Sequence, residues 1–287
     1  MESNDTNTPK NHHFIAKMHV ERFTDDKGRL WAFNKKSGKI FPASPKSIFA
    51  ESHLYTIEDA DGAKDTSLET DFSALEGAAN LIIKKLVAAA RSGQTCQLTP
   101  EERGTWDQYF YLQWKRVPDV HAKVASLTEA ESFLDNRFAE MRARDPDAAS
   151  EVDKLDTPEE RARLLQGGKV HAIRKDPGEF RAVLASRGLA LLHINPPDEA
   201  FAIGSLPIVR KSGDLRAQDS EAWLPISSDL AVGPADTPGT ITVIQLNDPK
   251  EIWRMNRVTA GQSSIFAAAS KCLIEKLVAD LPTTSRT

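Results

Sequence analysis

Apolar residues recur at every third or fourth position through one long stretch of the chain, which is the spacing of an amphipathic helix. The stretch opens with Thr66 to Glu69, which has the form of a capping box, and Gly93 closes it. Its apolar positions are Leu68, Phe72, Leu75, Ala79, Ile82, Leu86 and Ala90. The pattern predicts a helix of about six turns.

Two further helices are predicted directly after this one. Residues 99–102, Thr-Pro-Glu-Glu, form a second capping box and begin a helix that contains an aromatic cluster. Pro118 ends or kinks that helix near Arg116, because proline lacks the backbone N–H that a helix needs. The next helix runs from about Val120 to Arg144. Residues 145–180 predict short helices within an exposed linker, and one of these helices ends at residues 167–168. The helical middle of the chain therefore spans about residues 66–187.

Alternating apolar and polar residues predict strands on both sides of this middle part. Residues 29–34 and 39–41 flank the turn sequence Lys-Lys-Ser-Gly, which indicates a β-hairpin. A short helix at 44–51 and a strand at 53–57 follow. Late strands are predicted at 201–203, 223–226 and 241–246, and helices at 250–257 and 260–279.

These elements predict an α+β fold. Since the hairpin and the late strands are each too few to be stable alone, we expect them to share one mixed sheet with the helical middle packed against it. Residues 1–10 are polar and predict a disordered tail, residues 11–280 a single domain, and residues 281–287 a second tail.

Charge and composition narrow the function classes. The net charge of −4 and the pI near 6.0 argue against an electrostatic grip on nucleic acid by the whole protein, although a local basic groove fits both values. No apolar run is long enough to cross a bilayer, and the N-terminus lacks a secretory signal, so we expect no membrane partner. Two isolated cysteines, Cys96 and Cys272, predict neither a disulfide framework nor a cysteine zinc site, and indicate a cytoplasmic location.

The stretch from Asn11 to Phe23 carries the best local clue to chemistry. Its apolar spacing predicts a short helix with His12 and His13 at the N-terminal end. Imidazole serves as a general acid, a general base or a metal ligand near neutral pH. A pair of hydrogen-bonding histidines that ties this segment to the body of the protein is the structural alternative.

Carboxylates offer partners for these histidines. Glu69 and Glu76 lie two turns apart on one face of the long predicted helix, and Glu51 precedes the predicted strand at 53–57. His12, Glu51 and Glu76 are therefore candidate ligands of a divalent metal ion or an acid/base centre. Helix caps and salt bridges are the structural interpretation of each glutamate.

Arg116 and His121 have the Arg-x4-His spacing of small helical ribonucleases of the HEPN type. In such an enzyme the histidine acts on the 2′-hydroxyl while the arginine steadies the phosphate. The alternative for Arg116 is a cation at a helix end, buried beside Glu69 or Glu76. The nearby aromatic residues are interpreted as core, and the chain has no GxxxxGK, GxGxxG, HExxH or GxSxG motif.

Several of these residues belong to a recurring pattern. It comprises His12-His13-Phe14-Ile15, Arg22-Phe23, Gly28-Arg29-Leu30-Trp31, Glu51, Leu54-Tyr55-Thr56, Glu69, Glu76, Arg116, Pro118 and Asn256. In this pattern the chain resembles the bacterial family called domain of unknown function 4238, most densely over residues 11–120 and again over 200–275.

The chain also departs from that family pattern. Ala16 stands where the family usually has proline, and His19-Val20 where it usually has Tyr-Leu. The Ser-Asp pair that the family often shows before a late proline appears here as Gly204-Ser205, ahead of Pro207. If that aspartate is catalytic, this chain lacks it.

Two function hypotheses follow. In the first, the protein is a hydrolase, specifically a nuclease. His12, His13, Glu51 and Glu76 act at the reacting centre, Arg116 binds an anion, and Asn256 and His121 contact the nucleic acid. In the second, it is a non-catalytic binding or regulatory component, for example of a bacterial defence or toxin system, with a protein partner. The same residues then form a structural polar network.

Overall fold

The structure is a computed structural model that describes residues 11–58, 63–124, 127–145, 147, 149–175, 178–212 and 221–282. The described residues form two compact units. Unit 1 takes its residues from Met1–His12, Glu51–Phe72 and Val120–Asp176, and unit 2 from His13–Ala50, Ser73–Asp119 and Pro177–Thr287. Whether they are one domain, as the sequence predicts, stays a prediction. The predicted tail 1–10 lies outside the described residues, as do residues 283–287 of the predicted tail 281–287.

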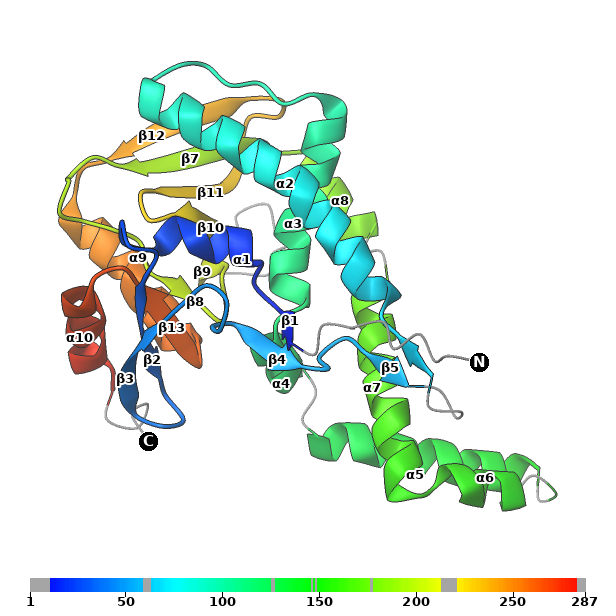
Figure 1. The fold of residues 1–287 in the computed structure, drawn as a ribbon. Coiled ribbons are helices and arrows are strands. Elements are labelled where there is room, and N and C mark those ends of the chain that lie inside the picture. Colours follow the sequence, from blue (N-terminus) through cyan, green and yellow to red (C-terminus); the bar gives the residue numbers. More distant parts are fainter. Residues whose placement is uncertain are drawn as a thin grey trace, which may run out of the picture. The chain divides into compact units, whose positions relative to one another are not determined.

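Among the described residues of unit 2, a five-stranded mixed sheet has the order β12-β7-β11-β10-β9. Its strands are β7 (Gly188–Ile194), β9 (Val209–Ser212), β10 (Glu221–Ser227), β11 (Leu230–Ala235) and β12 (Ile241–Leu246). β12 pairs with β7 in parallel, and β7, β11, β10 and β9 pair antiparallel (Figure 1). The predicted strands 223–226 and 241–246 are confirmed here, whereas β7, β9 and β11 are not predicted from the sequence.

Helices cover one face of this sheet. They are α2 (Ser67–Ser92, which passes from unit 1 into unit 2), α3 (Pro100–Lys115) and α8 (Gly178–Ala185). The apolar side of α2, including Ile83 and Leu86, packs with Trp106 of α3 against Leu191 and Leu224 of the sheet. Capping by Thr99 begins α3 as predicted, with Thr99 Oγ1 accepting from the Glu102 backbone N–H at 3.2 Å.

The hairpin shares a sheet with late strands, as predicted, but this is a second sheet. The predicted strands 223–226 and 241–246 lie in the five-stranded sheet, so the prediction of one common sheet is wrong. β2 (Leu30–Asn34) and β3 (Lys39–Ala43) pair around a turn in which Gly38 has a φ of 65°. The described strands are ordered β3-β2-β13-β8, with β8 at Ile203–Gly204 and β13 at Ile265–Ala268. The predicted helix 260–279 is wrong, because β13 lies between α9 (Pro249–Gln262) and α10 (Lys271–Asp280) and pairs on both edges.

The histidine segment is not the helix that its spacing predicts. Asn11–His13 is strand β1, and the helical residues are only α1 (Lys17–Val20) and the 3-10 turn η1 (Glu21–Phe23). The extended backbone is held by pairing, since the Phe14 N–H donates to the Phe49 carbonyl at 2.9 Å. This tertiary contact outweighs the local helical pattern.

The segment that follows the hairpin also differs from its prediction. Residues 45–49 form turns rather than a helix, and β4 covers Ala50–Ser52. The predicted strand 53–57 is a turn followed by β5 (Ile57–Glu58), which pairs with β6 (Lys64–Asp65). Phe49 and His53 both have a φ of 56°, a left-handed conformation that neither a helix nor a strand accommodates.

Unit 1 contains the helices α5 (Leu127–Arg144), α6 (Ala149–Leu155) and α7 (Pro158–Arg174), and α4 (Pro118–Val124) enters it from unit 2. The predicted helix 120–144 thus appears as α4 and α5. The predicted end of a short helix at Gly167–Gly168 is wrong, because α7 continues through both glycines.

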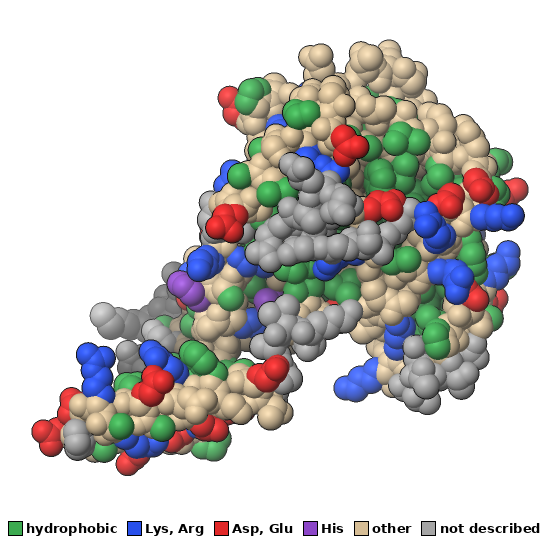
Figure 2. Space-filling model, turned by 180° about the vertical axis from the view of Figure 1, so that it is seen from behind, with side chains coloured by type: hydrophobic (Ala, Val, Ile, Leu, Met, Phe, Trp, Pro, Cys, Tyr) green, Lys and Arg blue, Asp and Glu red, His purple; other side chains and the backbone are tan. Residues whose placement is uncertain are grey.

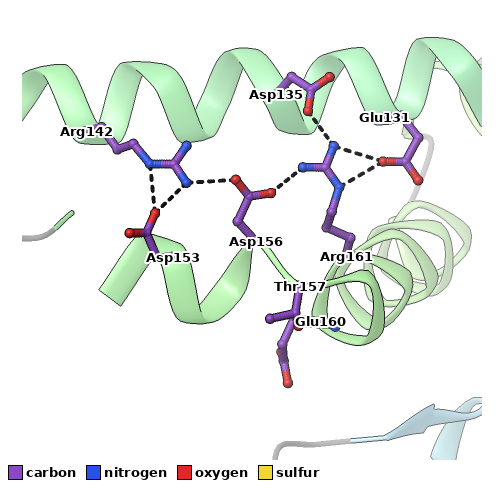
Figure 3. A network of polar contacts seen from close by, with 8 residues as sticks. All are labelled: Glu131, Asp135, Arg142, Asp153, Asp156, Thr157, Glu160 and Arg161. Atoms are coloured by element: carbon purple, nitrogen blue, oxygen red, sulfur yellow. Dashed lines mark hydrogen bonds and ion pairs between the residues drawn. The ribbon is translucent and has the colours of Figure 1, made fainter. Parts of the chain in front are cut away.

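Ion pairs hold α5, α6 and α7 together (Figure 3). Arg161, which is 18% exposed, contacts Glu131, Asp135 and Asp156, and Arg142 contacts Asp153 and Asp156. These two guanidinium groups hold the pKa of the Asp156 carboxyl below its usual value. The helices of unit 1 are therefore joined by polar contacts that supplement a small apolar core, which includes Phe138, Val152, Val170 and Ile173.

Figure 2 shows acidic and basic side chains interspersed over the described surface of one face, rather than gathered in one basic patch. In the part of the chain that the structure describes, no helix is both long enough and apolar enough to span a membrane.

Candidate functional site

His12 belongs to unit 1, where its side chain is 1% exposed. The backbone N–H of Tyr55 donates to its Nδ1 atom at 3.2 Å, and its ring stacks on that of Tyr55 with 5.8 Å between the centroids. A carboxylate oxygen of Glu69 lies 3.9 Å from the same nitrogen, which is too long for a hydrogen bond. The Tyr55 contact therefore anchors His12, and the glutamate that the structure brings near it is Glu69.

The other two predicted residues of the N-terminal part make different contacts, although Glu51 lies in β4, which pairs with β1. His13 belongs to unit 2 and is half-buried, with Nε2 3.2 Å from the carbonyl oxygen of Pro45. Because a carbonyl only accepts, that nitrogen donates. Glu51 is exposed in unit 1, where its charge opposes the fall in the Lys169 pKa that burial causes.

Arg116 and His121 do not share a helix. α3 ends at Lys115 with Arg116 as its C-cap, and α4 begins at Pro118, so the Arg-x4-His spacing does not place the two on one helical face. Arg116 belongs to unit 2, whereas the half-buried His121 belongs to unit 1. The ribonuclease-like motif, which rests on the Arg-x4-His spacing, stays a prediction.

Arg116 pairs with Glu76, as one of the two sequence interpretations predicts. Arg116 Nη1 donates to Glu76 Oε1 at 2.6 Å. The arginine side chain is 0% exposed, whereas that of the glutamate is 21% exposed. A wholly buried guanidinium thus fixes a carboxylate that keeps contact with solvent.

A second buried pair joins α1 to α3, the helix whose C-cap is Arg116. His19 of α1 and Tyr109 of α3 are both 0% exposed, and His19 Nδ1 lies 2.7 Å from the Tyr109 hydroxyl. His19 Nε2 lies 2.7 Å from the carbonyl oxygen of Pro225 in β10. Since the carbonyl can only accept, Nε2 carries the proton, and Nδ1 accepts from the tyrosine.

The pKa values of this pair keep both groups neutral. Burial lowers the pKa of His19 from 6.5 to about 4, assisted by the positive charges of Arg22 and Arg116 and opposed by the bond to Pro225. Burial also raises the pKa of Tyr109, against the effect of Arg116. His19 therefore has both nitrogens engaged and no charge at pH 7.

Four elements, α1, η1, α2 and α3, contribute to this region of unit 2. Tyr109, Gln113 and Arg116 follow the i, i+4, i+7 spacing of one face of α3. Arg22 of η1 donates from Nη2 to Asn80 Oδ1 of α2 at 2.7 Å. We call the set the buried polar centre, and it comprises His19, Arg22, Glu76, Asn80, Tyr109, Gln113 and Arg116.

Comparison with known proteins places the chain in a family. A family model described as "Protein of unknown function (DUF4238)" matches residues 11–271, which is nearly the whole chain. The chain belongs to this family. Neither the curated proteins nor the solved structures contain a significant match.

The structure explains how this DUF4238 chain accommodates Gly204-Ser205. Ser205 is 1% exposed and donates from Oγ to the carboxylate of Asp119, and it accepts from the Ile265 N–H at 3.2 Å. Asp119 Oδ1 also accepts from Ser264 Oγ at 2.8 Å. The serine thus joins the start of α4 to β13. The carboxylate of Asp119 already lies beside position 205, so an aspartate there would compete with Asp119 for the same place.

Gly204→Ser is expected to destabilise unit 2 by about 1–3 kcal/mol, because a Cβ atom at 204 would overlap Ser263 Oγ in a packed core. That Cβ would also lie 3.0 Å from Thr259 Cγ2. Gly104→Ala in α3 is the matched control, since its added Cβ meets nothing within 4 Å, and a gain of about 0.5–1 kcal/mol is expected. Denaturant unfolding measures both, and equal midpoints would contradict the overlap.

Asn256, the predicted substrate contact, is 1% exposed. Its Oδ1 accepts from the Ala202 N–H and its Nδ2 donates to the Ala200 carbonyl, both at 2.8 Å. The amide joins α9 to the segment before β8. A contact with substrate stays a prediction, and these two bonds supply a structural role.

Among the described residues, no group of three or more His, Cys, Asp or Glu side chains is placed to hold a metal ion. The proposed ligands His12, Glu51 and Glu76 thus stay a prediction. An open groove of about 800 Å³ follows α9 and α10, lined by Trp253, Lys250 and Cys272 among others, and none of the predicted site residues lines it.

Sequence reasoning missed His19, Tyr109 and Gln113 as members of a polar centre. His19 appeared only as a departure from the family pattern, and Tyr109 as part of an aromatic core. The signal that identifies Tyr109 and Gln113 is one face of α3 and its C-cap, on which a tyrosine hydroxyl, an amide and the Arg116 guanidinium follow one another at helical spacing. His19 has no such signal.

Proposed function

We propose that the protein is a hydrolase that cleaves phosphodiester bonds of nucleic acid, with Glu76 as the general base. The observation that carries the proposal is the carboxylate of Glu76, 21% exposed and fixed at 2.6 Å by the wholly buried Arg116. A general base needs a defined position and access to the proton that it removes. A carboxylate at the edge of a buried polar centre has both.

The chemistry assigned to Glu76 is the activation of water. The carboxylate takes a proton from a water molecule as the water oxygen forms a bond to phosphorus. The ester P–O bond breaks, and the leaving oxygen takes a proton from solvent. Arg116 acts here as a positioning residue for Glu76, which differs from the anion contact that the sequence suggests, because its side chain is 0% exposed.

The neutral pair His19–Tyr109 supports the same arrangement without taking part in proton transfer. His19 fixes the direction of the Tyr109 hydroxyl, whose proton points to Nδ1. The lone pairs of Tyr109 are then directed away from His19, and Tyr109 is electrostatically coupled to Arg116 and Glu76. The pair thus holds the Tyr109 hydroxyl in a fixed orientation within the buried polar centre.

The proposal assigns no step to a metal ion. The predicted cytoplasmic location stays a prediction.

The test is cleavage of labelled RNA and DNA oligonucleotides by the purified full-length protein. The rate for Glu76→Gln is expected to fall about 100-fold, which is typical of the loss of a general base. Glu275→Gln is the matched control, because Glu275 is also a helical glutamate bonded to a cation, Lys271, at 3.0 Å, but is 50% exposed. Absence of cleavage by the wild type, or equal rates in both variants, would refute the proposal.

The non-catalytic alternative has its own supporting observation. The amide of Asn256 and the ring nitrogens of His19 are all bonded within unit 2, as in a structural network. A binding or regulatory component, for example of a bacterial defence or toxin system, requires no reacting group. Lack of cleavage of every oligonucleotide, together with an unfolding midpoint that Glu76→Gln lowers, favours this alternative.

A further inference from the structure

Gln113 is an unusual member of the buried polar centre. Its side chain is 0% exposed, and neither Oε1 nor Nε2 has a hydrogen-bond partner among the described residues. An unpaired buried polar group costs roughly 1–3 kcal/mol, and the large majority of such groups in folded proteins are paired. The amide therefore presents one acceptor and two donor hydrogens to something other than the described protein.

Arg22 presents a second unsatisfied donor in the same centre. Nη2 is bonded to Asn80, whereas the buried Nε has no partner among the described residues. No described carboxylate lies within ion-pair distance of this half-buried guanidinium, and burial lowers its pKa from the ordinary value. A partly desolvated cation without a counter-charge favours an anion.

Arg22 of η1 and Gln113 of α3 both lie beside the His19–Tyr109 pair. Arg22 follows His19 by three residues through α1 and η1, a spacing that places the two side chains on one helical face, and its positive charge lowers the pKa of His19. Gln113 follows Tyr109 by four residues on one face of α3, where side chains are about 5–6 Å apart at Cβ. The exposed edge of the half-buried Arg22 offers access from solvent.

We infer that Arg22 and Gln113 form a binding site for a phosphate group with an adjacent hydroxyl, as in RNA. The Nε–H of Arg22 and an N–H of Gln113 donate to phosphate oxygens, and Oε1 of Gln113 accepts from the hydroxyl. A phosphodiester of RNA carries its 2′-hydroxyl beside the phosphate, whereas DNA has no such donor. The inference rests on the proposed function and names its substrate class.

The first test uses inorganic phosphate, which is not cleaved, and reads binding by calorimetry and thermal shift. The wild type is expected to bind, and Gln113→Leu to bind at least tenfold more weakly. Leucine is smaller than glutamine and carries no unpaired polar atoms, so this variant is expected to fold at least as stably. Arg22→Gln is expected to weaken binding likewise, whereas Arg29→Gln, which changes a side chain that is 63% exposed, is not.

The second test compares ribo- and deoxyribo-dinucleoside monophosphates of the same base. The wild type is expected to prefer the ribo form, and Gln113→Leu to lose that preference. No phosphate binding by the wild type, or equal binding by Gln113→Leu, overturns the inference, the second outcome indicating an adventitious ion only. Binding without any RNA cleavage refutes the proposed function alone. Cleavage that Gln113→Leu leaves unchanged, with no phosphate binding, refutes the inference alone.

Discussion

Arg116→Met is expected to lower the free energy of unfolding by about 3 kcal/mol at pH 7, because removal of one partner of a buried ion pair leaves the other charge uncompensated. The value is placed at the lower end of the usual range of about 3–5 kcal/mol, since the Glu76 carboxylate is 21% exposed and keeps part of its hydration. Denaturant unfolding, followed by tryptophan fluorescence, measures the loss.

The matched control is an ion pair of equal length on the surface. Arg254 Nη2 lies 2.6 Å from a carboxylate oxygen of Glu251, the same separation as in the buried pair, but the side chains are 54% and 43% exposed. Exposed pairs contribute little, so Arg254→Met is expected to cost only a small fraction of the Arg116→Met loss. Equal losses would show that distance, rather than burial, determines the energy of these pairs.

A double variant separates the pair energy from the loss of packing. Arg116→Met combined with Glu76→Leu removes both charges, and replacement of a whole buried ion pair by apolar residues is often neutral or stabilising. The double variant is therefore expected to recover most of the stability that Arg116→Met loses. Recovery would also show that the pair is retained for a reason other than stability, as the proposed role of Glu76 requires.

The parts of the fold that the sequence predicts well are those with local causes. The hairpin has a four-residue turn with Gly38 at a positive φ, and α3 has a complete capping box, so neither needs a distant partner. β13 has no such signal. Its residues Ile265–Ala268 continue a helical pattern, and their conformation is decided by β2 and β8, which pair on either side.

The candidate site divides in the same way. The Glu76–Arg116 pair could be anticipated because two boundary glutamates and a helix-end arginine have few other ways to be buried together. The bond from His19 to Pro225 could not be anticipated. The two residues are 206 positions apart, and every residue has a backbone carbonyl, so no residue type indicates the acceptor. His12 and His13 are adjacent, yet one contacts the Tyr55 backbone and the other that of Pro45.

The free energy of unfolding is expected to decrease as the pH falls, because His19 is buried and neutral in the folded protein. The pKa of His19 is about 4 in the folded protein, whereas the unfolded chain has the ordinary histidine pKa of 6.5. Below pH 6.5 the unfolded chain takes up a proton that the folded protein does not, so the free energy of unfolding decreases as the pH falls. The decrease ends near pH 4, where folded His19 also takes up a proton.

The expected loss between pH 7 and pH 4 is roughly 3 kcal/mol from this residue, since the two pKa values differ by about 2.5 and each unit corresponds to about 1.4 kcal/mol. His19→Gln keeps a hydrogen-bond donor and acceptor but does not titrate. Between pH 7 and pH 4 the free energy of unfolding of this variant should therefore decrease by less than that of the wild type, and the difference should be about this amount. Carboxylates titrate alike in both proteins, and the difference between their pH profiles isolates His19. His171→Gln, at an exposed position of α7, should follow the wild type.

Parallel profiles for the wild type and His19→Gln would show that His19 titrates normally in the folded protein. That result would also reopen the assignment of the general base, because a histidine that accepts protons near neutral pH can act as one. The geometry argues for the opposite, with Nε2–H bonded to a carbonyl and Nδ1 to a hydroxyl at 2.7 Å each. A histidine fixed in this way orients Tyr109 and leaves proton transfer to the solvent-accessible carboxylate of Glu76.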